Sequence, residues 1–273
     1  MILLAASAAL AGSWNLSHQV AVSWFPKGLR YFGTYEYRMP LPWKSDSVLF
    51  DDVYFAPGAE LEVSPAYARA GGRFHFTPIA VLEIEGEALA TEYFGTFSGV
   101  TDFDRPDADF SDEAFERPEV VARRHSGFGF RYGITPTLQA KVSHLIIAAP
   151  QEFTRFTMIK PDGVTGEYWY EPQYDALFKW DDTVMVNNAY AFWAFRESSK
   201  EDSRFFWVGA QFNHQLVFGT GDTQLKAGPM VVFKAGQSKW VPTAVVFVEA
   251  WIQSPIHPIM PPYLAAAAVW KQG

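Results

Sequence analysis

Apolar and polar residues alternate along most of this chain. The stretch from residue 73 to 87, "RFHFTPIAVLEIEGE", places its charged residues at odd positions and its phenylalanines, leucine and last isoleucine at even positions. A period of two is typical of a β-strand, because successive side chains of a strand point to opposite faces. About twelve segments show this alternation, and most are about 10 to 15 residues long. Strands of soluble proteins are usually ~5 to 6 residues long and tilted membrane strands ~9 to 11, so these lengths favour strands that cross a membrane.

The connections between the segments also fit a membrane barrel. We place them near residues 25–28, 40–49, 64–65, 77–79, 99–122, 134–136, 150–182, 197–202, 219–222, 235–238 and 254–261. The two longest are the fifth and the seventh. In an up-and-down barrel all odd-numbered connections lie at one end, so both long ones would face the exterior if the chain starts in the periplasm. Long exterior loops and short periplasmic turns are typical of outer-membrane barrels.

Three of the predicted turns set a register. A two-residue turn at 64–65 and three-residue turns at 77–79 and 134–136 keep apolar residues opposite apolar ones, with a hairpin at 70–73 as an alternative to the second turn. Opposite charges on paired positions stabilise a sheet by roughly 0.2 to 1 kcal/mol per pair. The polar pairs expected from these turns are Glu60 with Arg69, Arg73 with Glu83, and Arg131 with Gln139.

Composition supports an all-β protein and excludes several functions. Aromatic residues make up 17% of the 273 residues and favour strands, whereas the 20 glycines and 18 prolines favour the turns between them. The formal net charge of −8 argues against a nucleic-acid-binding surface, which needs clustered Lys and Arg. The chain has no cysteine, so it can form neither a disulfide framework nor a thiolate metal site.

The first residues, "MILLAASAALAG", form a short apolar run that ends in small residues. This fits a signal peptide over residues 1–11 without its basic start, followed by a barrel domain over residues 12–273; an apolar first strand is the alternative. No later run approaches the ~20 apolar residues of a transmembrane helix, which excludes a helical membrane protein.

Alternating strands, aromatic-rich strand ends, Thr-Pro turns and the N-terminal apolar run together resemble the bacterial outer-membrane β-barrel proteins, at the level of the class and not of one family. The resemblance implies a single antiparallel up-and-down transmembrane β-barrel of about 12 strands in the bacterial outer membrane. It also implies contact with membrane lipid and insertion by the outer-membrane assembly machinery. One departure is the C-terminus, "AAAAVWKQG", where such barrels commonly end in an aromatic residue and this chain has Trp270 three residues short of its end.

The alternation predicts which charged side chains face the lumen of such a barrel. A narrow channel, or a barrel that binds or transports a small polar solute, would use them as solute contacts. If the charges only pair with one another, they fill the interior of a structural envelope protein. The predicted lumen residues are Arg30, Glu36, Arg38, Glu60, Arg69, Arg73, His75, Glu83, Glu85, Arg131, Lys141 and Lys226.

A soluble all-β protein, lipocalin-like or a sandwich that binds an apolar ligand, is the main alternative. The two hypotheses differ in where the apolar face points. Phe74, Phe76, Leu82 and Ile84 would face lipid in the membrane barrel and would be buried in the soluble protein.

The remaining candidate chemistry is limited. Asp102, Asp104, Asp107 and Asp109 lie close together in an acidic loop that we expect to be solvated, with calcium binding as the alternative. An outer-membrane lipid-modifying enzyme would need histidine and serine to converge near the membrane rim, and the neighbours are His125 with Ser126 and His144 with Ser143. Neighbours along a strand point to opposite faces, so neither pair could cooperate within one. No cofactor-binding motif is present, and we expect no cofactor.

Overall fold

A computed structural model describes residues 12–24, 28–42, 53–198, 202–238, 240–256 and 263–272. The segment interpreted as a signal peptide, residues 1–11, lies outside these ranges. Among the described residues, no helix is both long and apolar enough to cross a membrane.

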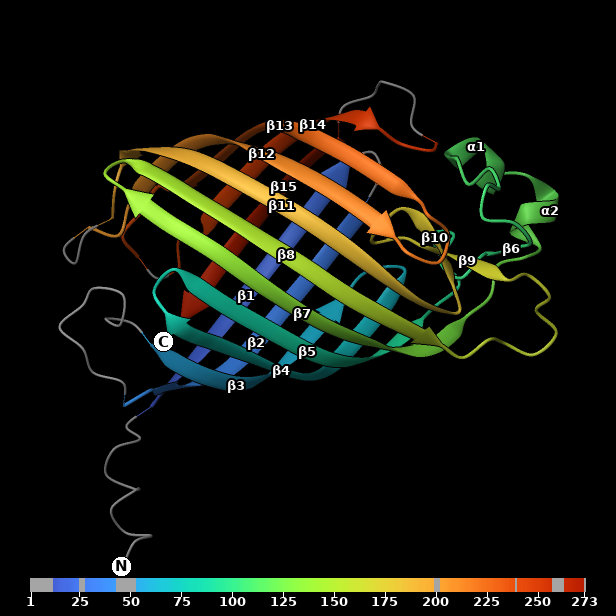
Figure 1. Ribbon diagram of the computed structural model, residues 1–273, viewed down its shortest axis with the longest axis horizontal. Coiled ribbons are helices and arrows are strands. Elements are labelled where there is room, and N and C mark those ends of the chain that lie inside the picture. Colours follow the sequence, from blue (N-terminus) through green and yellow to red (C-terminus); the bar gives the residue numbers. More distant parts are fainter. Residues whose placement is uncertain are drawn as a thin grey trace, which may run out of the picture.

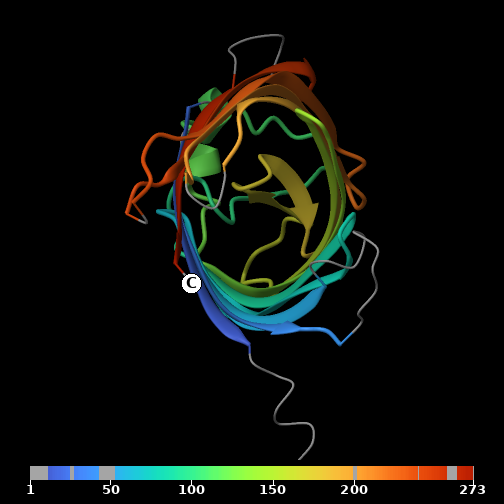
Figure 2. The same ribbon diagram turned by 90° about the vertical axis from the view of Figure 1, so that its left-hand side faces the viewer.

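Twelve strands in the described ranges form a closed antiparallel barrel, as Figures 1 and 2 show. Each strand pairs with the barrel strands before and after it in the chain, and the first pairs with the last, so the ring has no edge. This confirms the predicted up-and-down barrel of about 12 strands. The barrel strands are β1 (Ser13–Trp24), β2 (Gly28–Pro40), β3 (Tyr54–Val63), β4 (Tyr67–Ile79), β5 (Leu82–Tyr93), β7 (Gly127–Val142), β8 (Leu145–Met158), β11 (Asp181–Arg196), β12 (Phe205–Val217), β13 (Thr223–Lys234), β14 (Thr243–Gln253) and β15 (Tyr263–Gln272).

The outer surface of the barrel is apolar. Trp24 and Leu138 are each 57% exposed, and many further aromatic and aliphatic residues of the strands are exposed as well. Phe74 and Phe76 also lie on this face, where they are partly exposed and pack sideways against Phe55. The soluble alternative required a buried apolar face and is therefore wrong. An apolar outside on a closed barrel is the arrangement that a lipid bilayer stabilises.

The two ends of the barrel differ, as predicted. The connections 80–81 and 143–144 are tight turns at what we call the short-turn end, on the left in Figure 1. The two long connections, 94–126 and 159–180, both lie at the opposite, long-connection end.

All three predicted register pairs are wrong. The first turn is longer than two residues, because the Ser64 hydroxyl accepts hydrogen bonds from the backbone N–H groups of Ala66 and Tyr67, both at 3.1 Å. Consequently Arg69 lies opposite Glu62 and not Glu60.

The other two turns fail because proline is tolerated inside the strands. Pro78 lies at an irregularity of the β4–β5 pairing, so β4 continues to Ile79 and Arg73 pairs with Glu87. Pro136 lies within the continuous strand β7, where Arg131 faces Leu89 and Phe156. Shifts by an even number of residues leave each side chain on its face, so the predicted inward set does not change.

A second small sheet lies at the long-connection end and comes from the two long connections. It has the order β10-β9-β6 and is visible through the ring in Figure 2. Two short helices from the first long connection lie beside it (Figure 1). The elements are β6 (Asp102–Phe103), α1 (Asp112–Phe115), α2 (Pro118–Val121), β9 (Tyr168–Glu171) and β10 (Ala176–Lys179). We call the sheet and its two helices the plug.

The plug has an apolar core on each face of its sheet, because β9 and β10 also alternate. Trp169 and Phe178 face the barrel and pack with residues of β4, β5, β8, β11 and β12. Tyr170 and Leu177 face the other way and pack with Phe115 and other residues of the first long connection. The plug is thus attached to the barrel wall by buried aromatic contacts.

Candidate site in the barrel interior

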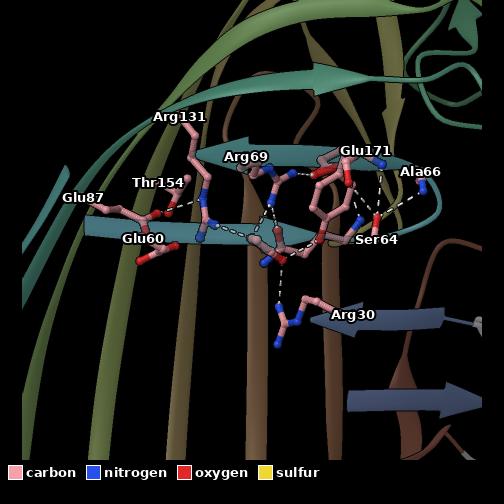
Figure 3. Close-up of polar contacts among 12 residues, drawn as sticks. Arg30, Glu60, Ser64, Ala66, Arg69, Glu87, Arg131, Thr154 and Glu171 are labelled. Carbon is pink, nitrogen blue, oxygen red and sulfur yellow. Dashed lines mark hydrogen bonds and ion pairs between the residues drawn. The ribbon is translucent and has the colours of Figure 1, made fainter. Parts of the chain in front are cut away.

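A buried charge network joins the plug to the barrel wall below it. The guanidinium of Arg69 on β4 contacts the carboxylates of Glu62 at 3.4 Å and of Glu171 on β9 at 2.5 Å. It also donates to the hydroxyl of Tyr93 at 2.8 Å and lies over the ring of Tyr67 at 3.8 Å. The side chains of all three charged residues are almost completely buried. Figure 3 shows Arg69 between the wall and the plug. Buried charges need such partners, since leaving one unpaired is strongly destabilising.

Arg131 on β7 organises the next layer. Its guanidinium lies 2.9 Å from Glu87, 3.2 Å from Glu152 and 3.7 Å from Glu62. Glu62 therefore links Arg131 to Arg69, and it also accepts a hydrogen bond from Tyr67 at 2.6 Å. Figure 3 shows Arg131 with Glu87, and Glu60 beside them.

Arg73 on β4 organises a third layer, nearer the short-turn end. Its guanidinium lies 2.8 Å from Glu36, 3.2 Å from Glu60 and 2.9 Å from Glu85. Three strands, β2, β3 and β5, supply the three carboxylates. The alternation of each strand turns these side chains inward, and the antiparallel pairing sets them at one height.

A cavity of about 230 Å³ remains between Arg73 and Arg131. Four carboxylates and two guanidinium groups line it, and four negative charges minus two positive ones leave a formal charge of −2. Glu60 is only 5% exposed, and its Oε1 is buried without a hydrogen-bond partner. A buried acceptor without a partner is costly, so this oxygen favours a ligand that brings a donor or a positive charge. The lining residues are Glu60, Arg73, Glu85, Gly86, Glu87, Arg131, Gly133, Thr135 and Glu152.

The remaining predicted lumen residues lie around this network. Arg30 contacts Glu62 at 3.4 Å, and Arg38 lies over the Tyr54 ring at 3.7 Å. His75 and Glu83 contact each other at 2.5 Å. On the opposite wall, Lys226 lies over the rings of Trp251 and Tyr263 at 4.6 and 4.9 Å. Lys141 pairs with Glu197 at 2.6 Å in a half-exposed contact at the short-turn end, apart from the network.

Sequence reasoning missed four carboxylates of the site. Glu62 and Glu87 share the inward parity of their predicted neighbours and could have been found by extending the alternation. Glu152 and Glu171 were placed in the connection 150–182, of which residues up to 158 belong to β8 and residues 168–179 form the plug strands. Their roles depend on how that connection folds back onto the barrel.

The four aspartates of the acidic loop do not converge on one point. Asp102 contacts His125 at 3.1 Å, whereas Asp104 contacts Arg123 at 2.7 Å and Asp109 contacts Arg117 at 2.7 Å. The hydrogen bond from Arg123 lowers the pKa of Asp104, and hydrogen bonds from Ser111 and then Arg117 lower the pKa of Asp109. Asp107 lies 3.5 Å from Arg105 at the surface. Most of this loop is therefore folded and held by ion pairs, and calcium binding by it stays a prediction.

The two histidine–serine neighbours lie outside strands, so the reason given against their cooperation does not apply. His125 and Ser126 precede β7, and Ser143 and His144 form the turn between β7 and β8. The hydrogen bond of His125 is to Asp102, and His144 pairs with Glu197 at 3.4 Å.

Comparisons with known proteins give fold-level likenesses only. No protein-family model matches the chain, and no curated protein matches it. Among solved structures it is similar to the beta domain of the Bordetella autotransporter BrkA, with a TM-score of 0.48, 8% identity, and coverage of 95% of this chain and 99% of that one. It is also similar to the translocator domain of the autotransporter NalP from Neisseria meningitidis, with a TM-score of 0.41, 11% identity, and coverage of 99% and 91%.

The architecture itself assigns the class. A closed antiparallel barrel pairs its own backbone groups, and with long strands, an apolar outside and a charged inside it has the architecture of a barrel that spans an outer membrane, where lipid contacts the apolar face. The chain is thus an outer-membrane β-barrel protein.

Proposed function

We propose that this barrel binds and passes a small cationic solute. The observation that carries the proposal is the cavity of about 230 Å³ with four carboxylates, two guanidinium groups and the unpartnered Oε1 of Glu60. At about 30 Å³ per water molecule, this volume corresponds to seven or eight waters, which suits a small ion with its hydration shell or a small amine. A formal charge of −2 in a partly desolvated interior attracts cations and repels anions.

The plug defines the resting state under this proposal. Aromatic contacts with five barrel strands and the Arg69–Glu171 pair support a plug that stays docked at the long-connection end and blocks the lumen there. Passage therefore requires the plug to move or to rearrange, and we expect a low conductance that occurs in discrete openings.

The test is ion selectivity in a planar bilayer. We expect the purified chain to show a reversal potential in a KCl gradient that corresponds to K⁺ over Cl⁻. Glu60→Gln and Glu87→Gln, which remove cavity charges at constant volume, should each reduce this preference. Glu119→Gln on the exposed helix α2 is the matched control and should leave it unchanged.

Two results would contradict the proposal. Anion preference in the wild-type protein would show that the guanidinium groups dominate the cavity. A complete lack of conductance, both in the wild type and after the plug is loosened by Trp169→Ala, would favour a filled interior with a structural role in the envelope.

A further inference from the structure

A mixed cluster of donor atoms lies next to the cavity, toward the short-turn end. The imidazole of His75 on β4 and the carboxylates of Glu83 and Glu85 on β5 each offer one atom, and these atoms all lie within 4.8 Å of one another. We propose that His75, Glu83 and Glu85 bind a divalent transition-metal ion of the Zn²⁺ type inside the barrel.

The backbone places the three residues for this role. His75 and Glu85 are directly paired across β4 and β5, and Glu83 is the next residue of β5 on the same inward face. Directly paired residues in an antiparallel sheet have Cβ atoms only ~4.5 to 5.5 Å apart. The ligand set therefore rests on one rigid hairpin, and only side-chain rotations are needed to close it.

The distances are compatible with a bound ion. Zn²⁺ lies about 2.0 to 2.2 Å from imidazole nitrogen and carboxylate oxygen, so ligand atoms around a tetrahedral ion are about 3.3 Å apart. Nε2 of His75 and Oε1 of Glu83 are now 2.5 Å apart and must separate slightly, while the widest pair must approach by at most about 1.5 Å. Both movements are within the reach of a glutamate side chain, which has three rotatable bonds.

Neighbouring groups allow this rearrangement. Glu85 now pairs with Arg73, but Arg73 also contacts Glu36 at 2.8 Å and Glu60 at 3.2 Å and keeps both if Glu85 turns to an ion. The hydroxyl of Tyr54 lies 3.3 Å from Nδ1 of His75, and this contact can orient the imidazole when Nε2 binds the ion. Three protein ligands leave at least one coordination position for water or a solute, which is the pattern of an exchangeable site and not of a structural one.

The donor chemistry selects the class of ion. One imidazole nitrogen with two carboxylate oxygens suits Zn²⁺ and its first-row neighbours, whereas Ca²⁺ prefers six to eight oxygen ligands. The inference goes beyond the proposed passage of small cations, because it requires only that the folded barrel holds the ion.

The test is metal binding by the whole chain folded in detergent. Equilibrium dialysis against ZnCl₂, with metal analysis, should give one ion per chain, and CoCl₂ should give visible absorption bands of a low-coordinate site. His75→Ala, Glu83→Gln and Glu85→Gln should each weaken binding by at least about tenfold, because even the loss of a partner that only supports a metal ligand costs about 10- to 100-fold.

A matched control comes from the same end of the barrel. His144 also contacts a carboxylate, Glu197, but it is outside the three-donor cluster, so His144→Ala should leave the affinity unchanged.

Unchanged affinity in His75→Ala or in both glutamine variants would overturn the assignment, as would the absence of stoichiometric binding to the wild type. Gel mobility before and after heating shows that each variant is folded, and the isosteric glutamine variants still decide the question if His75→Ala does not fold. Glu87→Gln separates the two proposals. Glu87 lines the cavity and pairs with Arg131 at 2.9 Å, and it lies outside the three-donor cluster, so this variant should alter ion selectivity and leave Zn²⁺ binding intact.

Discussion

Removing the indole of Trp169 should undock the plug from the barrel. This side chain is completely buried, and its ring packs edge-on against Tyr93 at 5.3 Å and near Phe156 and Phe178 at 6.2 and 5.8 Å. Its Nε1 also donates to the carbonyl of Lys179 at 3.0 Å. Replacing a buried tryptophan by alanine costs about 3 to 5 kcal/mol. Because the barrel wall has its own closed hydrogen-bonded ring, we expect this cost to fall mainly on plug docking.

The cost corresponds to a measurable change in gating. Since about 1.4 kcal/mol is a factor of ten, the ratio of undocked to docked plug should rise by about two to three and a half orders of magnitude in Trp169→Ala. Single-channel recording should show a higher open probability, and the amides of β9 and β10 should exchange hydrogen faster. The control is Trp193→Ala on the outer face of β11, where the indole is 50% exposed. Equal open probability and equal exchange in Trp169→Ala and the wild type would refute the view that this core holds the plug.

Three further predictions follow from local features. Burial raises the pKa of Asp222, in the turn between β12 and β13, to about 6. The contribution of this carboxyl group to stability is therefore complete below pH ~4 and is lost as the pH rises through 6. Urea unfolding in detergent should show that Asp222→Asn removes this loss. A Cβ at Gly71 would lie 2.1 Å from a carbonyl oxygen of β5, whereas a Cβ at Gly72 would meet nothing within 4 Å. Gly71→Ala should therefore destabilise the barrel by about 1 to 3 kcal/mol and lower the temperature of the heat-induced gel shift. Gly72→Ala is the control and should do neither. Glu171→Gln should destabilise the docked plug by leaving Arg69 short of one charge, and this penalty should shrink in the Arg69→Met background; equal effects in both backgrounds would show that the pair is not coupled.

The sequence was sufficient to predict the barrel. Long alternating segments favoured strands that cross a membrane, and their number gave the size of the ring. The inward position of residues such as Glu60 and Arg73 followed from parity alone. An error in turn length that shifts the register by an even number of residues leaves each side chain on the same face. The wrong pairing of Arg69 with Glu60 therefore did not move either side chain to the outer face.

Turn chemistry limited the register. Pro78 and Pro136 were taken as turn residues, yet both lie within strands. Pro78 lies at an irregularity of the β4–β5 pairing, and Pro136 is paired with Ile84 of β5. Single-strand patterns do not show such positions, because they depend on the partner strand.

Only the tertiary structure decided what the lumen contains. The segment 159–180 was treated as a loop, but its residues Trp169, Glu171 and Phe178 return to the barrel and pack or pair with its strands at one end. The cavity between Arg73 and Arg131 and the convergence of His75 with two glutamates depend on cross-strand register and on side chains from several strands. Local alternation fixes which face a side chain takes, since it is a property of one strand. The partners that it meets inside a ring depend on how the whole ring closes.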